Sequence, residues 1–101
     1  MPIAAATDGS DAARPALPMD ADVWQEVASS LTLSPQQQRI VELILQGRQD
    51  KEIAAALGLS VPTVRTYLKR VFDRTGANDR LDLVLRIFSI AQRVAKRHHQ
   101  R

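Results

Sequence analysis

The stretch "KEIAAALGLSVPTVRTYLKRVFDRTG", residues 51–76, contains two helical patterns separated by a short turn with a glycine. Small and apolar residues share one face before the turn. After it, Val64, Leu68 and Val71 recur at helical spacing and form a narrow stripe. The turn is only a few residues long, so the two helices must cross steeply. The stretch therefore predicts a helix-turn-helix whose second helix spans about 61–75.

Cationic side chains lie opposite the apolar stripe of this second helix. Arg65 and Lys69 are four residues apart, which places them one turn apart on the same face. On an arbitrary helix such a face is simply exposed to solvent. On the second helix of a helix-turn-helix, the outward face is positioned to enter the major groove of DNA. Guanidinium and ammonium groups there can reach the acceptors of a guanine edge. We therefore predict base contacts from Arg65 and Lys69, with Thr66 adding a methyl or hydroxyl contact.

Other polar side chains near this helix suit an anionic oxygen. Ser60 and Thr63 stand at its N-terminus, where the helix end is electropositive. For these two residues plain N-capping is an alternative role, and both roles are compatible. We predict phosphate contacts from them and from Lys51, Tyr67 and Arg70.

Three further helices are expected around the motif. A short helix over 22–31 contains Trp24, which we expect to pack on the domain, and "LSPQQQRIVELILQG", residues 33–47, begins with the favourable cap Ser34. A long helix over 79–97, capped by Asn78, carries apolar residues on more than one face. The domain core alone would not bury all of them. We therefore predict a dimer interface on this helix, formed by Leu83, Ile87, Ile90 and Val94.

The chain as a whole is expected to be all-α, a four-helix helix-turn-helix domain with a short preceding helix and no strands. The predicted organisation is a disordered acidic arm over 1–21, the domain over 22–97 with its core at 33–85, and a basic tail over 98–101. Residues 1–30 carry five acidic side chains and one arginine, whereas the rest of the chain carries thirteen Lys/Arg and six acids. A strongly basic compact part is typical of nucleic-acid binding.

Composition excludes several classes of function. The chain has no cysteine, no apolar run long enough to span a membrane and no secretory signal pattern, so we expect a soluble cytoplasmic protein without a membrane partner. No nucleophile–base pair, paired carboxylate cluster or metal constellation indicates an enzyme. His98 and His99 point about 100° apart on a helix and make a poor chelate. No cofactor and no metal are expected.

The order and spacing of several motifs resemble the DNA-binding domain of the LuxR/GerE-type bacterial transcription regulators. The matching pieces, between about Leu33 and Leu85, are "LSPQQQRIVELILQG", "KEIA", "LGLS", "TVR" and "ANDR". The resemblance implies a four-helix fold whose fourth helix often carries the dimer contact. Arg80 matches the family's downstream arginine, for which a phosphate contact and a structural ion pair are both open. The chain departs from the family pattern at Gln37, Arg39, Tyr67 and Thr75.

The resemblance implies a sequence-specific DNA-binding transcriptional regulator that acts on double-stranded DNA as a homodimer. Such domains commonly follow a phosphoreceiver or ligand-binding domain, as in response regulators. The segment before Trp24 is too short and too polar to be either, so we expect a stand-alone regulator or a fragment. Two alternatives stay open. One is a module resembling sigma-factor region 4 that binds promoters with RNA polymerase, and the other is a protein-interaction module that uses the fourth helix.

Overall fold

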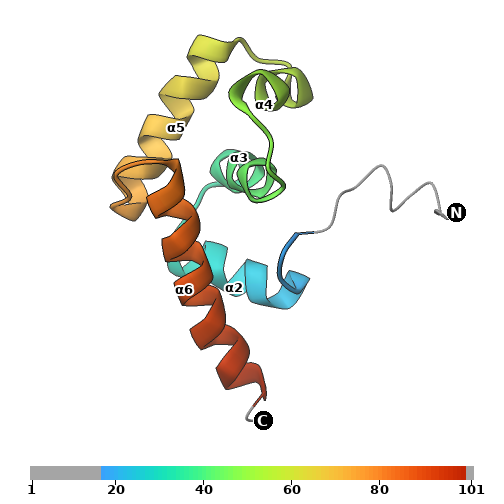
Figure 1. Ribbon diagram of the computed structural model, residues 1–101, viewed down its shortest axis with the longest axis vertical. Helices are drawn as coiled ribbons and strands as arrows, with labels where there is room; N and C mark the ends of the chain where they lie inside the picture. Colours follow the sequence, from blue (N-terminus) through green and yellow to red (C-terminus); the bar gives the residue numbers. More distant parts are fainter. Residues whose placement is uncertain (1–16, 100–101) are drawn as a thin grey trace, which may run out of the picture.

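A computed structural model describes residues 17–99, which form five helices and no strand (Figure 1). The all-α prediction is therefore confirmed for this part of the chain. The helices are α2 (Ala21–Ser30), α3 (Pro35–Leu45), α4 (Asp50–Leu57), α5 (Val61–Thr75) and α6 (Arg80–His99). The bounds expected for α5 agree with the structure, and those of the first and last helices differ by one or two residues.

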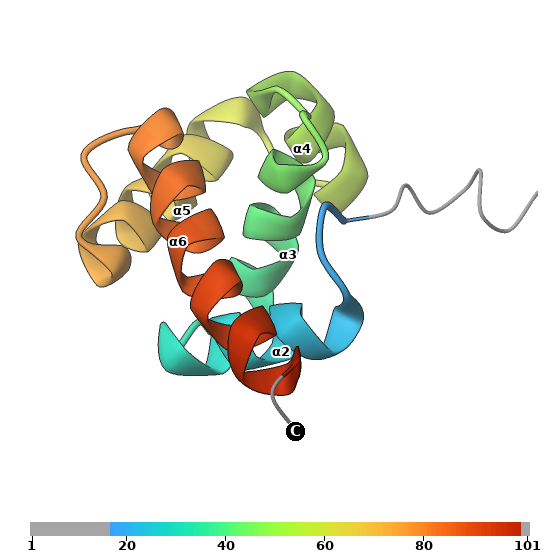
Figure 2. The ribbon, with the colours of Figure 1, turned by 60° about the horizontal axis from the view of Figure 1, so that its bottom comes forward.

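The helices pack around one apolar core. Helix α5 contacts α3 and α4, while α6 contacts α3 and packs most extensively against α2, which crosses it (Figures 1 and 2). Every buried side chain in the described range is hydrophobic. The largest fully buried ones come from all five helices: Trp24, Val27, Ile40, Val41, Ile53, Val64, Val71, Leu83 and Ile87. Their burial provides most of the driving force that holds the helices in place.

Local capping interactions fix where α3 and α6 begin. Ser34 Oγ accepts a hydrogen bond from the backbone N–H of Gln37, and the Gln37 side chain accepts one from the Ser34 N–H. This capping box agrees with the expected start of the helix. At α6 the prediction that Asn78 caps the helix is wrong. Asp79 Oδ1 accepts the N–H of Asp82 at 2.8 Å, while the N–H of Asn78 donates to the Asp82 carboxylate and lowers its pKa.

Helix α2 is joined to the domain by both packing and polar contacts. Trp24 is 2% exposed, so its expected packing role is confirmed, and its indole N–H donates to Glu42 of α3 at 2.8 Å. Glu26 of α2 accepts hydrogen bonds from two residues in the last turn of α6, Arg97 and His98, the latter through Nε2. The bond from His98, reinforced by Arg97, lowers the pKa of the Glu26 carboxyl despite partial desolvation. These contacts make α2 part of the domain.

Two expected boundaries need correction. The disordered arm was predicted to reach residue 21, but Leu17 and Met19 pack against the core and Ala21 already belongs to α2. Residues 1–16 lie outside the described range. The basic tail was predicted to begin at residue 98, whereas α6 continues through His99. In this last turn of α6, Arg97 and His98 contact Glu26 of α2.

The predicted dimer residues on α6 also need correction. Leu83, Ile87 and Val94 are at most 2% exposed, because they lie in the core of the monomer, where α6 packs against α2 and α3. Ile90 is only partly buried. Sequence reasoning overlooked that a short helix distant in the chain would pack here. The large apolar side chains that α6 exposes are instead Leu81 and Leu85, at 66% and 58% exposure. None of the helices between residues 17 and 99 is long and apolar enough to cross a bilayer.

We predict that Trp24→Ala destabilises the domain by about 3–5 kcal/mol, because it removes a large buried side chain and leaves a cavity between α2 and α3. Urea unfolding followed by circular dichroism measures the loss. Gln25→Ala, an exposed neighbour on the same helix, is the control and is expected to change stability by less than about 0.5 kcal/mol. A loss below about 1 kcal/mol for Trp24→Ala would show that α2 contributes little to the fold.

Candidate nucleic-acid interface

The turn between α4 and α5 sets the angle at which these two helices cross. Gly58 adopts a left-handed conformation with φ of 68°, and the following N–H, that of Leu59, donates to Ala54 at 2.9 Å. A Cβ at Gly58 would meet nothing within 4 Å, so the backbone conformation rather than space favours glycine here. Ser60 then caps α5. The chain thus passes from α4 to α5 within three residues, Gly58 to Ser60, as the predicted helix-turn-helix requires.

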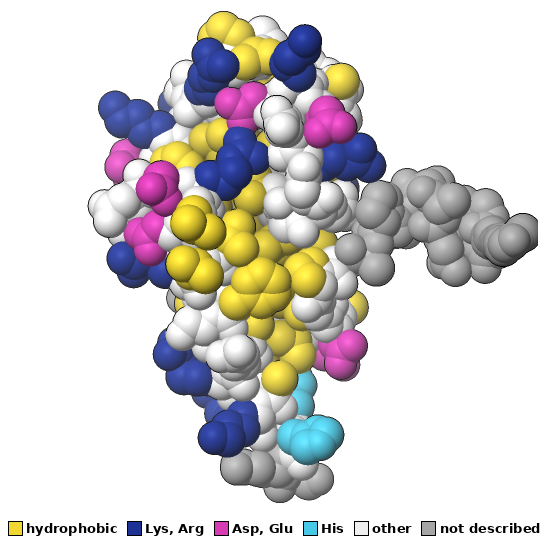
Figure 3. Space-filling view, in the orientation of Figure 1, with side chains coloured by type: hydrophobic (Ala, Val, Ile, Leu, Met, Phe, Trp, Pro, Cys, Tyr) yellow, Lys and Arg dark blue, Asp and Glu magenta, His cyan; other side chains and the backbone are white. Residues whose placement is uncertain are grey.

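One face of α5 is held in the core and the opposite face is exposed. Val64, Leu68 and Val71 are at most 5% exposed, whereas the Arg65 side chain is 69% exposed and Lys69 is also exposed. Lys and Arg side chains gather around the end of the molecule formed by α4 and the first half of α5 (Figure 3). The predicted opposition of apolar stripe and cations is therefore confirmed. The cationic face points outward and is available for a ligand.

Hydroxyl groups at the start of α5 are arranged in a short chain. Ser60 Oγ accepts the N–H of Thr63 at 3.3 Å and donates its own hydrogen to Thr63 Oγ1 at 2.9 Å. The hydroxyl hydrogen of Thr63 is thereby left to donate to another acceptor. Thr66 donates to the carbonyl of Pro62 at 3.1 Å, which leaves its methyl group and oxygen lone pairs for outside contacts. Capping and ligand contact are thus compatible at Ser60 and Thr63.

Tyr67 and Arg70 lie together beside the start of α3. The Arg70 guanidinium stands over the Tyr67 ring, 5.6 Å from its centroid, which is within the range of a cation–π contact. Both residues line an open depression with Ser34, Gln36 and Gln37. Tyr67 is half-buried and Arg70 is exposed. The structure therefore places these two predicted phosphate-contact residues at one edge of α5.

A carboxylate connects three helices beside Arg65. Asp50, the first residue of α4, accepts from Arg65 Nε at 3.4 Å through Oδ2 and pairs with Arg80 of α6 through Oδ1. Arg80 also donates to the backbone carbonyl of Arg48 at 2.9 Å. Of the two roles considered for Arg80, the structure records the ion pair. Arg48, Lys51, Arg65 and Arg80 together line one open depression with Asp50.

Sequence reasoning missed Asp50 as a site residue. It is 15 positions from Arg65 and 30 from Arg80, so no local spacing indicated the contact. The only signal was its place in the first turn of a helix, where acids are common for a different reason. Glu52, in contrast, pairs with Arg48 at 3.6 Å, four residues away on the chain, a contact that local spacing does indicate.

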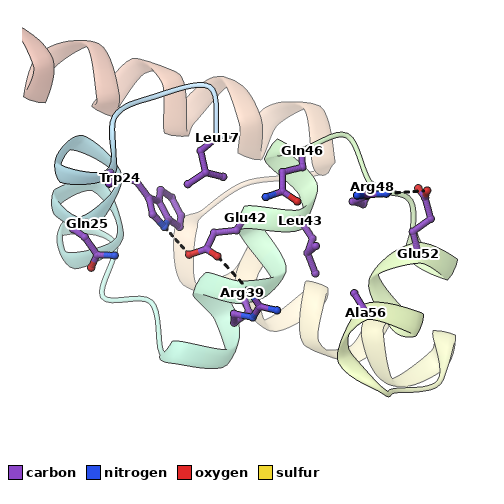
Figure 4. A pocket seen from close by; sticks show the side chains of 11 residues that line it. Leu17, Trp24, Gln25, Arg39, Glu42, Leu43, Gln46, Arg48, Glu52 and Ala56 are labelled. Carbon is purple, nitrogen blue, oxygen red and sulfur yellow. Dashed lines mark hydrogen bonds and ion pairs between the residues drawn. The ribbon is translucent and has the colours of Figure 1, made fainter. Parts of the chain in front are cut away.

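Another hollow lies between α2, α3 and α4 and contains none of the predicted contact residues (Figure 4). Its charged side chains pair with one another or with the indole. Glu42 accepts from Trp24 and pairs with Arg39 at 3.8 Å, and Arg48 pairs with Glu52. Across residues 17–99, no three His, Cys, Asp or Glu side chains gather as a metal site would require. The outward face of α5 is therefore the strongest candidate site.

The family described as "Bacterial regulatory proteins, luxR family" matches residues 31–87. This range contains α3, α4 and α5 and the first part of α6, but it leaves α2 outside. The helix-turn-helix and its exposed cations thus lie wholly within the matched part. No solved structure matches the chain.

Curated relatives match the same part of the chain. Response regulator Rre1 of Synechocystis sp. is 44% identical over 54 residues, which cover 54% of this chain and 23% of that protein. A probable HTH-type transcriptional regulator of Streptomyces halstedii, GfsR, is 37% identical over 57 residues, or 56% of this chain and 24% of GfsR. The probable transcriptional regulator ycf29 of Cyanophora paradoxa is 33% identical over 54 residues, or 54% and 26%. The chain therefore spans about a quarter of the length of these relatives.

The two roles of Ser60 can be separated by a pair of substitutions. Ser60→Ala removes the cap and is expected to destabilise the domain by about 1 kcal/mol. Ser60→Asp keeps an N-cap acceptor and is expected to preserve stability, while its negative charge weakens binding of a DNA duplex. Thermal unfolding and fluorescence anisotropy at low salt measure the two effects. Unchanged DNA affinity in a stably folded Ser60→Asp variant would contradict a phosphate near this end of α5.

Proposed function

The chain belongs to the luxR family of bacterial regulatory proteins, and we propose that it regulates transcription by binding DNA in a sequence-specific manner, with α5 in the major groove. The observation that carries this proposal is the two-sided character of α5. Its apolar stripe is buried against the domain while Arg65 and Lys69 stay exposed on the outward face. An α-helix fits the major groove, and a fixed helix can present the same side chains to base edges each time.

The base-reading role falls to the first half of α5. Arg65 can donate two hydrogen bonds to the O6 and N7 atoms of a guanine, and Lys69 can donate to the same class of acceptor one turn further along. Thr66 lies between them in sequence. Its methyl group suits a thymine methyl, and its remaining lone pairs suit a base amino group. These three residues would supply discrimination between sequences.

The phosphate-binding role falls to the residues around this centre. Lys51 borders the depression beside Arg65, and Thr63 keeps a free hydroxyl hydrogen at the electropositive start of α5. Tyr67 and Arg70 flank the other edge of the helix. Phosphate contacts on both sides of a recognition helix would fix its depth and register in the groove without reading sequence. Arg80 is already paired with Asp50, so a phosphate contact from Arg80 would form beside this ion pair or replace it.

We further propose that two copies pair through the exposed part of α6. Leu81 and Leu85 are four residues apart, so they lie one turn apart on the same helical face. Large apolar side chains exposed together are common at protein contacts. Paired copies would place their two α5 helices in successive major grooves, about 34 Å apart on one side of the DNA. Two half-sites would then supply the specificity that one short helix lacks.

Selection from a pool of random DNA duplexes tests the sequence-reading proposal. The full chain is expected to enrich a motif with two related half-sites, and the double variant Arg65→Ala/Lys69→Ala is expected to lose the motif. The matched control Arg93→Ala/Lys96→Ala removes the same charge from the far end of α6 and should keep it. Salt-sensitive binding without enrichment, in the unaltered chain, would contradict sequence reading and leave only attraction to phosphates.

The dimer proposal predicts that Leu85→Glu uncouples the two half-sites. Burying a carboxylate in an apolar contact is unfavourable, so pairing should be lost while the fold, in which Leu85 is 58% exposed, is retained. Sedimentation of the protein on one-site and two-site duplexes measures the stoichiometry. Gln92→Glu, which adds a charge at another exposed position of α6, is the control. Two copies bound cooperatively by the Leu85→Glu variant would contradict pairing through this face.

A further inference from the structure

We infer that Asp50 is a positioning residue that determines specificity by orienting Arg65 for base recognition. The inference rests on the proposed function and adds to it a residue outside α5. Asp50 is the first residue of α4 and its side chain is 25% exposed, between Arg65 and Arg80. No spacing in the sequence assigns it this role. Its position follows from the crossing of α4, α5 and α6.

Arg80 holds the Asp50 carboxylate in a fixed place. It pairs with Oδ1 and is itself fixed by a hydrogen bond to the carbonyl of Arg48 at 2.9 Å. The second oxygen, Oδ2, is thereby turned toward α5. This oxygen meets Arg65 Nε at 3.4 Å. The carboxylate is thus anchored from α6 and is not a freely rotating surface group.

The contact with Nε selects how Arg65 can meet a base. A guanidinium carries five N–H donors, one on Nε and four on the two terminal nitrogens. If Asp50 engages Nε, the outer edge with both terminal nitrogens stays available for the O6 and N7 atoms of one guanine. A side-on approach that uses Nε is excluded. A single approach geometry favours one base at one position over the alternatives.

The same contact reduces the conformational freedom that Arg65 loses on binding. The Arg65 side chain is 69% exposed, so in the absence of a partner it would sample many rotamers. A planar guanidinium already held on one edge has less freedom left to lose. Asp50 brings a negative charge close to a face that must meet phosphates, which by itself weakens non-specific attraction. The two effects together raise discrimination relative to general affinity for DNA.

The test compares variants by the ratio of affinities for two duplexes. One duplex carries the selected motif, and the other differs at the base pair whose preference Arg65→Ala abolishes. Asp50→Asn is expected to lower this ratio about tenfold, while affinity for random-sequence DNA at low salt stays equal or increases. Asp73→Asn removes the same charge from an exposed position of α5 and is expected to leave the ratio unchanged.

A double-mutant cycle separates positioning from general structural effects. In the Arg65→Ala background, Asp50→Asn should cause no further loss of affinity for the duplex with the selected motif, because Asp50 acts through Arg65. An equal loss of that affinity in both backgrounds, or an unchanged ratio in Asp50→Asn, would overturn the inference. If Asp50→Asn fails to fold, Arg65→Lys provides the test. It leaves the Asp50–Arg80 pair in place and removes Nε, so a retained ratio would also overturn the inference.

The outcome is distinguishable from a failure of the proposed function. If the unaltered chain selects no motif, the sequence-reading proposal fails and this inference fails with it. If the unaltered chain selects a motif and Arg65→Ala changes one position of it, the proposed function stands. The role of Asp50 is then decided by the ratio and by the double-mutant cycle. Circular dichroism of each variant confirms that the compared proteins are folded.

Discussion

Burial of one narrow stripe of α5 is the constraint on which the rest of the structure depends. Val64 and Val71 are fully buried and Leu68 nearly so, which fixes the rotation of α5 about its own axis. Once that rotation is fixed, the residues on the opposite side of the helix must face outward. Arg65 and Lys69 are exposed for this reason. The cations could not be turned inward without removing the stripe from the core and burying unpaired charge.

Helix α2 determines which surface of α6 remains free. It lies before the range that matches the luxR family, yet among the helices of residues 17–99 it packs most extensively against α6. Together with α3 it packs on the apolar face of α6, on which Leu83, Ile87 and Val94 are buried within the monomer. Glu26 reinforces this packing through Arg97 and His98. A second copy can therefore meet α6 only on the faces that α2 leaves uncovered, where Leu81 and Leu85 lie.

Features encoded by neighbouring residues could be predicted from the sequence, and features that depend on distant contacts could not. The bounds of α5, the cap at Ser34 and the exposed cations follow from residues within one or two turns of each other. The packing of α2 against α6 includes the contacts of Glu26 with Arg97 and His98, which are 71 and 72 positions away, and apolar periodicity does not indicate which partner covers a face. Another distant contact joins Arg74 to Thr32, which adopts a φ of 51° in the α2–α3 turn.

If Asp50 orients Arg65 as we propose, a basic face alone is an incomplete description of how this domain would read DNA. Attraction to phosphates increases with each cation, but it is nearly independent of sequence. A carboxylate among the cations lowers that general attraction and restricts the geometry of one arginine. Because Arg80 ties the carboxylate to α6, the position of Arg65 depends on the packing of three helices and not on α5 alone. Specificity in such a small domain would then be a property of its whole fold, with the recognition helix as the part that touches the bases.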